Sequence, residues 1–239
     1  MPRETFVLVP GAWLGAWAWR RVVPLLEADG SAAYPLTLTG MGDRVHLAAP
    51  HIGLETTIQD VINVIIYEGL EDVVLVGHSF AGKVVAGVAD RIPERISTLI
   101  FLDAIRPAKV RTPQVSIADW PKKERDELMK EARRRGDGWK YPLPGKLLNS
   151  IGRDVVGKDR EWFLSKTTLW PIKMIQDPIT LSEKYDGVNK AYIFCSGGGD
   201  DIEQIKKEKL DGPYRILDSG HWPMITMPKK LAKAMLELA

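Results

Sequence analysis

The chain has 239 residues, of which 45% are hydrophobic and 27% are charged, and its formal net charge is +2. These values are close to those of ordinary globular proteins, so they exclude wholesale disorder, collagen-like repeats and a coiled coil. No apolar run approaches the roughly 20 residues of a membrane helix. Since the chain also shows no export signal and has a single cysteine, Cys195, we expect a cytoplasmic protein.

Short apolar segments rich in β-branched residues have the composition of buried parallel strands, and segments with helical periodicity separate them. Because the two kinds alternate, we predict an α/β fold with a doubly wound, mostly parallel sheet. The strands are expected at Thr5–Val9, Ala33–Leu38, Val73–Val76, Thr98–Leu102, Ala191–Cys195 and, more weakly, Tyr214–Leu217. The helices are expected at Trp17–Glu27, Thr56–Glu68, Phe80–Asp90, Ile202–Lys209 and Lys229–Leu238.

Residues 106–187 break this alternation, because their apolar residues recur with helical rather than strand spacing. The segment is too long for a loop. We therefore predict a helical cap (lid) at 106–187, inserted into a core formed by residues 1–105 and 188–239. Its basic runs, such as Arg133–Arg135, alternate with acidic residues at helical spacing, which favours a solvated helix face over a nucleic-acid surface.

The most specific local motif runs from the strand Val73–Val76 through Gly77-His78-Ser79-Phe80-Ala81-Gly82 into a helix. A serine at the apex of such a tight turn has strained backbone angles, tolerates only small neighbours and stands clear of the sheet. The N–H of Phe80, at the positive end of the helix, would face a developing oxyanion. We predict that Ser79 is a nucleophile rather than an ordinary N-cap.

A serine nucleophile needs a general base, and the chain has four histidines. His78 adjoins Ser79 and is expected to point away from the site. His46 and His51 lie in an early loop, at a spacing that suits no simple metal pair. His221 follows the last strand and would reach the sheet edge from which Ser79 emerges, so we predict that His221 is the base.

Two places at this edge offer the acid that would orient His221. Asp103 directly ends its strand, whereas Asp200 and Asp201 follow the flexible run Gly197–Gly199 and would equally cap the next helix. Both choices give the chain order serine, acid, histidine. We favour Asp103 and keep Asp200 or Asp201 as the alternative.

The second oxyanion donor is expected in the loop after the first strand, where Gly11 and Gly15 let the backbone approach a ligand, and the N–H of Ala12 is our candidate. Tryptophans near these elements suggest a pocket for a small, neutral, partly aromatic substrate. The candidates for its walls are Trp13 and Trp222, which adjoin the catalytic elements in sequence, and Trp120 and Trp162 in the cap, where Trp139 and Trp170 also lie.

Together these residues resemble the α/β-hydrolase superfamily, and within it the branch of small esterases and hydroxynitrile lyases. The loop Leu8–Trp13, the Ser79 turn and Gly220-His221 are similar to motifs of that branch. Leu54–Val61, Ala89–Arg95 and Leu102–Ala104 look most like bacterial carbamate-cleaving esterases of the carbendazim-hydrolysing type. The resemblance implies the α/β-hydrolase fold and supports Asp103 as the acid by analogy.

The chain departs from these relatives at three places. Pro10-Gly11 stands where they usually have His-Gly, so the oxyanion loop lacks a supporting side chain. Ala81 replaces a usual glycine, which should be tolerated. Hydroxynitrile lyases carry a threonine in the first loop and a lysine after the histidine, where this chain has Gly11 and Trp222, and this argues against cyanohydrin cleavage.

We therefore predict a serine esterase that cleaves a small neutral, aromatic ester or carbamate through an acyl-enzyme on Ser79, with no metal or organic cofactor. A hydrolase-fold lyase or cofactor-free oxygenase with the same Ser79–His221 pair, and a non-catalytic ligand sensor, remain alternatives. The expected partner is a small-molecule substrate, with no nucleic acid and no membrane, and a homodimer is left open.

Overall fold

Six parallel strands form the main sheet of the computed structural model, which describes residues 2–107, 110–198 and 201–239. The strand order is β2-β1-β3-β4-β7-β8, so the chain adds β2 on one side of β1 and the later strands on the other side. Ligands of such sheets bind at the carboxyl ends of the strands where the order switches, here between β1 and β3. The predicted α/β fold with a parallel sheet is confirmed. The strands are β1 (Thr5–Val9), β2 (Ala32–Pro35), β3 (Val73–His78), β4 (Ile96–Leu102), β7 (Lys190–Gly197) and β8 (Tyr214–Gly220).

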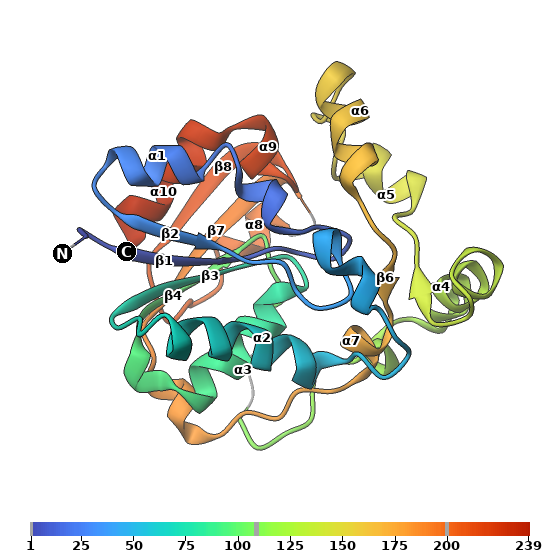
Figure 1. Ribbon diagram of the computed structural model, residues 1–239, viewed down its shortest axis with the longest axis horizontal. Helices are drawn as coiled ribbons and strands as arrows, with labels where there is room; N and C mark the ends of the chain where they lie inside the picture. Colours follow the sequence, from blue (N-terminus) through green and yellow to red (C-terminus); the bar gives the residue numbers. More distant parts are fainter. Residues whose placement is uncertain (1, 108–109, 199–200) are drawn as a thin grey trace.

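Helices cover both faces of this sheet (Figure 1). On β1, Val7 and Val9 join one cluster of buried apolar side chains and Phe6 and Leu8 join the other, because successive strand residues point to opposite faces. Both faces of the sheet are therefore buried, as expected of a parallel sheet. One face carries α2 (Leu54–Tyr67) and α3 (Ala81–Arg91), and the other carries α1 (Val23–Ala28), α9 (Pro223–Thr226) and α10 (Pro228–Leu238).

Two predicted helices are shorter in the structure. The segment Trp17–Glu27 divides into a 3-10 turn, Ala16–Trp19, and α1, which has a proline in its first turn. Proline lacks an N–H and is accepted at a helix start but not in its interior. The segment Ile202–Lys209 is helical only in α8 (Ile202–Ile205), because residues 206–209 are exposed and offer no apolar face to pack.

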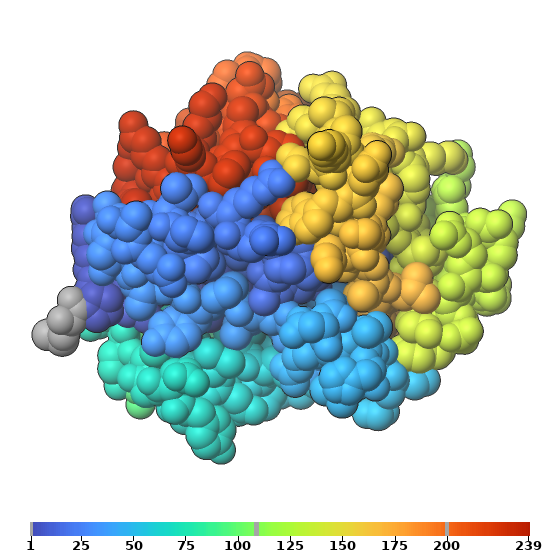
Figure 2. Space-filling view, turned by 45° about the horizontal axis from the view of Figure 1, so that its top comes forward, coloured from blue at the N-terminus to red at the C-terminus, as the bar shows by residue number. Residues whose placement is uncertain are grey.

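We call residues 106–187, between β4 and β7, the insert. Figure 2 shows its yellow-green, yellow and gold parts, which lie against the N-terminal segment in blue and the C-terminal segment in red. Its separation into a cap domain remains a prediction. None of the helices in the described residues is both long and apolar enough to cross a bilayer. The insert contains α4 (Lys122–Arg135), α5 (Gly145–Ser150), α6 (Gly157–Lys166), α7 (Lys173–Gln176) and the antiparallel pair β5 (Lys140–Tyr141) and β6 (Trp170–Pro171).

Candidate active site

Ser79 lies at the apex of a tight turn between β3 and α3. Its φ is 57°, a left-handed conformation that is strained for any residue other than glycine. A Cβ atom at Gly77 would lie 2.5 Å from Cγ2 of Val85, and one at Gly82 would lie 2.1 Å from the carbonyl oxygen of Ile105. The small residues around Ser79 therefore follow from the packing of the turn.

The imidazole of His221 joins Ser79 to Asp103. Its Nε2 lies 2.8 Å from Oγ of Ser79, and its Nδ1 lies 2.5 Å from Oδ2 of Asp103. Ser79 directly follows β3, His221 follows β8 and Asp103 follows β4, and the carboxyl ends of these strands lie at one edge of the sheet. A carboxylate on Nδ1 favours the tautomer that carries its proton there, which leaves Nε2 free to accept the proton of the serine.

The carboxylate of Asp103 is also held by the C-terminal end of β7. Its Oδ1 accepts a hydrogen bond from the N–H of Cys195 at 3.1 Å. Gly198 lies directly against the carboxylate, because a Cβ there would be 2.1 Å from Oδ2 of Asp103. No motif in the sequence indicated this role of Gly198, since a glycine-rich run suggests only a flexible loop.

The structure does not bring Asp201 to His221. Asp201 is exposed at the start of α8, where its Oδ1 accepts hydrogen bonds from the N–H groups of Glu203 at 3.0 Å and Gln204 at 3.3 Å. It is thus a helix N-cap, the alternative use of an aspartate at that place. Asp200 lies outside the described residues.

His78 does not simply point away from the site, as its place beside Ser79 led us to expect. It is fully buried, its ring centroid lies 4.6 Å from that of His221, and its Nε2 lies 2.8 Å from the carbonyl oxygen of His221. Burial, and secondarily the nearby His221 ring, lower the pKa of His78 well below its usual range. A neutral ring must carry its proton on Nε2 to donate this bond, so His78 holds the backbone of His221 in place.

The two candidate oxyanion donors, the N–H groups of Ala12 and Phe80, belong to residues that line the hollow beside Ser79. Within the described parts of the chain, neither N–H donates a hydrogen bond. The insert supports the loop that carries Ala12 through two hydrogen bonds. Nε1 of Trp13 donates to the carbonyl oxygen of Tyr141 at 2.9 Å, and the N–H of Thr168 donates to the carbonyl oxygen of Trp13 at 3.0 Å. These bonds hold the loop despite Pro10.

A mainly apolar hollow of about 360 Å³ opens beside Ser79. Its ionisable side chains are those of Asp103 and His221, which are already bonded to each other. Its aromatic walls are Trp13, Phe80, Trp120 and Trp170, and the insert adds Leu147, Ile151 and Ile175.

The structure corrects the expectation that Trp222 and Trp162 line this hollow. Trp222 is 1% exposed, and its ring packs against Phe163, with ring centroids 4.9 Å apart, and edge-on against the ring of His221 at 5.3 Å, so it contacts the proposed base without lining the hollow. Trp162 packs edge-on against Trp17 at 5.2 Å, on the same side of the sheet as Trp222. Trp170, which adjoins no catalytic element in sequence, takes a place in the wall instead.

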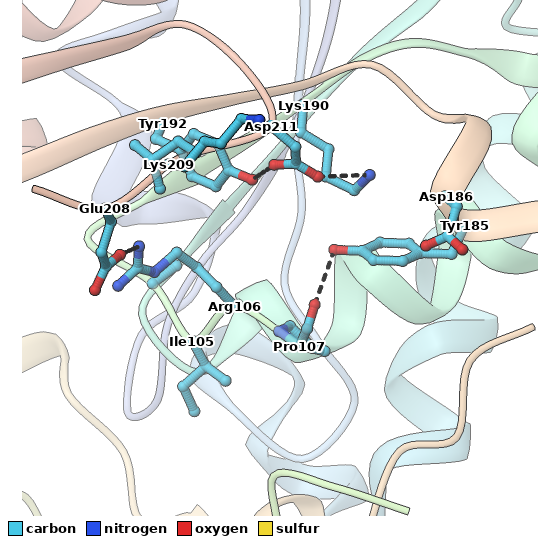
Figure 3. A pocket seen from close by; sticks show the side chains of 12 residues that line it. Ile105, Arg106, Pro107, Tyr185, Asp186, Lys190, Tyr192, Glu208, Lys209 and Asp211 are labelled. Carbon is cyan, nitrogen blue, oxygen red and sulfur yellow. Dashed lines mark hydrogen bonds and ion pairs between the residues drawn. The ribbon is translucent and has the colours of Figure 1, made fainter. Parts of the chain in front are cut away.

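A second hollow, of about 510 Å³, shares only two residues of the loop after β4 with the first (Figure 3). Four of its six charged side chains form pairs: Arg106 with Glu208 at 3.3 Å, and Lys190 with Asp211 at 3.1 Å. The hydroxyl of Tyr192 donates to the same Asp211. Its lining contains neither serine nor histidine, so the arrangement suited to acyl transfer is the one at Ser79.

Comparisons of the sequence agree with this geometry. The model of a family described as "Alpha/beta hydrolase family" matches residues 6–234. The chain is 32% identical over 248 residues to a carbendazim hydrolyzing esterase from Nocardioides sp. (strain SG-4G), covering 98% of both chains. It is also 27% identical to norfluorocurarine synthase 1 from Strychnos nux-vomica, covering 99% of this chain and 96% of that one. The predicted resemblance to carbendazim-hydrolysing esterases is confirmed.

Solved structures share the fold. An extracellular alpha/beta-hydrolase from a Paenibacillus species superposes with a TM-score of 0.84 at 22% identity, covering 99% of both chains. Methylketone synthase I from tomato superposes with a TM-score of 0.79 at 17% identity, covering 99% of this chain and 98% of that one. At these identities the likeness concerns the fold alone.

Proposed function

The chain belongs to the alpha/beta hydrolase family and is a carboxylic ester hydrolase, and we propose that Ser79, His221 and Asp103 are its catalytic triad. The observation that carries the proposal is the continuous pair of hydrogen bonds from Asp103 through His221 to Ser79, at 2.5 and 2.8 Å. Both bonds lie next to an apolar hollow that a substrate can enter.

In this proposal His221 takes the proton of Ser79 as the hydroxyl oxygen attacks the substrate carbonyl carbon. The N–H groups of Ala12 and Phe80 donate to the oxygen that becomes negative. His221 then returns the proton to the leaving alcohol, and an acyl group remains on Ser79. A water molecule, deprotonated by His221, releases the acid and restores the enzyme.

We propose a small, neutral, aromatic ester or carbamate as the substrate. The hollow offers no unpaired charge to bind an ionised group, and four aromatic side chains line it. Within the wall, Trp170 lies 5.1 Å from Phe80 and 5.5 Å from Trp13, measured between ring centroids. The similarity to an esterase named for carbendazim makes carbendazim a direct test compound.

We propose further that the insert acts as the cap of this site. It supplies five side chains of the wall, from Trp120 to Ile175, and so it would set which groups fit beside Ser79. Closure over the substrate would also exclude water and strengthen the polar interactions of the oxyanion.

Cyanohydrin cleavage is a weaker candidate. A side chain at position 11 has no room, because a Cβ on Gly11 would lie 2.9 Å from Cβ of Ser79. The residue after the histidine, Trp222, has an uncharged side chain buried among apolar ones, so no cation for cyanide stands at this position. Neither position can therefore supply the groups that such lyases use.

The test is an acyl-enzyme assay on the whole chain. We expect p-nitrophenyl acetate to release a burst of p-nitrophenol and a fluorophosphonate probe to label the protein, and Ser79→Ala to abolish both. A neutral aromatic ester should be preferred over p-nitrophenyl hemisuccinate, which carries a charge. Labelling that persists in Ser79→Ala, or turnover without any burst or labelling, would remove Ser79 from its proposed role.

A further inference from the structure

The loop that carries His221 is held from the insert as well as from the sheet. The N–H of His221 donates to the carbonyl oxygen of Ile151 at 2.7 Å, and the N–H of Gly220 donates to Oδ2 of Asp154 at 2.8 Å. Two successive backbone donors beside the proposed base therefore find their acceptors between α5 and α6. Neither bond belongs to a strand or helix of the sheet domain.

The carboxylate of Asp154 is also bonded to other residues of this loop. Its Oδ2 also accepts from the hydroxyl of Thr226 at 3.0 Å and lies 3.4 Å from the hydroxyl of Ser219. These donors flank His221 on both sides in sequence. A carboxylate can accept several hydrogen bonds at once, and charge-assisted bonds are stronger than neutral ones.

The contact leaves no space for adjustment. A Cβ on Gly220 would lie 2.1 Å from Oδ1 of Asp154 and 2.5 Å from the carbonyl oxygen of Ile151. A Cβ on Gly152 would lie 2.1 Å from the ring of Trp222, the residue after His221. The insert and the histidine loop therefore fit together through two glycines, one on each side.

We propose that Asp154 is a positioning residue for the general base: through Gly220 and Thr226 it fixes the loop so that Nε2 of His221 stays within bonding distance of Ser79. Asp154 itself touches neither the Ser79 hydroxyl nor the hollow. This inference rests on the role proposed above for His221. It makes the insert part of the apparatus that holds the base, in addition to a wall of the pocket.

The experiment compares two carboxylates that both join the insert to the sheet domain. Asp159 on α6 pairs with Arg21 at 2.6 Å, and Arg21 donates to the carbonyl oxygen of Ile225 at 2.8 Å. Asp159 thus reaches this segment only through Arg21 and bonds no group of Ser219, Gly220 or Thr226, so Asp159→Ala is the matched control. We expect Asp154→Ala to lower kcat for p-nitrophenyl acetate by roughly 10- to 100-fold with little change in KM. Asp159→Ala should keep the kcat of the unaltered protein, and Asp154→Asn, which retains an acceptor oxygen, should recover most of the loss.

A readout independent of turnover is the low-field proton resonance of the Nδ1–H of His221 hydrogen-bonded to Asp103. We expect this signal in the unaltered protein and in Asp159→Ala, and its loss or broadening in Asp154→Ala. Should Asp154→Ala fail to fold, Thr226→Val removes one donor from the same carboxylate and should lower kcat by about threefold.

Unchanged kcat and an unchanged resonance in Asp154→Ala would overturn the inference. Equal losses in Asp154→Ala and Asp159→Ala, in step with their melting temperatures, would also overturn it, because Asp154 would then serve only to dock the insert. If no ester is hydrolysed yet the resonance responds as described, the proposed function fails while the positioning role stands.

Discussion

Ser79 and Asp103 are held by backbone bonds within the sheet, whereas His221 is held from two sides, by His78 of β3 and by the insert. The N–H of Ser79 donates to the carbonyl oxygen of Leu102 at 3.1 Å, and that of Asp103 donates to the carbonyl oxygen of Ile193 at 2.7 Å. These are backbone bonds to residues of the neighbouring strands, and they survive most side-chain changes. The insert adds particular side chains, such as Asp154 and Trp120, to its backbone bond between Ile151 and His221, so substitutions of those side chains should have graded and separable effects.

The largest expected effect on kcat concerns Asp103, which is held by the sheet. Asp103→Asn should lower kcat by about 10³- to 10⁴-fold, because an amide facing Nδ1 favours the tautomer in which Nε2 cannot accept the serine proton. The measurement is steady-state hydrolysis of a p-nitrophenyl ester.

Asp201→Asn is the control for that substitution. An asparagine can still cap α8 through its side-chain oxygen, so turnover should stay within about tenfold of the unaltered protein. If Asp201→Asn were the damaging change and Asp103→Asn the mild one, the acid would belong to the loop after β7.

A smaller loss of kcat is expected for a substitution at Gly198, which follows β7 and contacts the carboxylate of Asp103. Gly198→Ala would place a methyl group 2.1 Å from Oδ2 and 2.6 Å from Oδ1 of Asp103, so the carboxylate must move. Displacement of a catalytic group by about 1 Å costs roughly 10²-fold in rate. We expect a fall of that order in kcat with little change in KM.

The matched glycine for this test is Gly187, where an added Cβ meets no atom within 4 Å. Gly187→Ala should leave kcat unchanged. Equal rates in Gly198→Ala and the unaltered protein would mean that the loop after β7 yields and that Asp103 is held by its backbone alone.

The sheet side of the molecule was also the more predictable side. The strand β1 was predicted with its observed bounds, Thr5–Val9, and the turn at Ser79 was recognised because strand, small residues and helix follow one another locally. Such signals lie within a dozen residues of sequence. The choice between Asp103 and Asp201 stayed open because both follow strand ends at the same edge.

The insert side depends on contacts that local sequence does not encode. Trp222 adjoins His221 in sequence and contacts its ring, yet it is buried in an apolar cluster outside the hollow, whereas Trp170 reaches the hollow from 51 residues before His221. Asp154 belongs to no motif, and its role follows only from where the insert meets the histidine loop. Side-chain direction and tertiary pairing, rather than residue type, decide such positions.

The pocket wall offers a test of the insert with a moderate effect. Trp120 and Trp139 are both half-buried tryptophans of the insert, but only Trp120 lines the hollow beside Ser79. Trp120→Ala should raise KM for an aromatic ester by about tenfold, since one aromatic contact of roughly 1 to 1.5 kcal/mol is lost. KM for an ester without an aromatic ring should change less.

Trp139→Ala controls for the general effect of removing a tryptophan from the insert, and its KM should stay near that of the unaltered protein. Equal rises in KM for the two variants would show that the shape of the whole insert, rather than the wall formed by Trp120, sets affinity for the aromatic group.

The last and smallest expected effect concerns stability, at Lys83, a fully buried lysine of α3 whose Nζ donates to the carbonyl oxygen of Asp177, at the end of α7. Burial lowers its pKa to about 8, against the opposing influence of Asp177 and then Asp119. The ordinary pKa, 10.5, applies in the unfolded chain. Between these values the unfolded state holds more protons, so a rise in pH favours the folded state.

We therefore expect the free energy of unfolding to increase from pH 8 towards pH 10.5, by at most about 1.4 kcal/mol per pH unit, relative to Lys83→Met. The difference between the two proteins, measured by urea unfolding at pH 7.5 and pH 9.5, cancels the titration of every other group. Below pH 8 it should be flat, because Lys83 is then protonated in both states. A difference independent of pH across this range would mean that Lys83 keeps its ordinary pKa, and that the insert meets α3 through a charge that water still reaches.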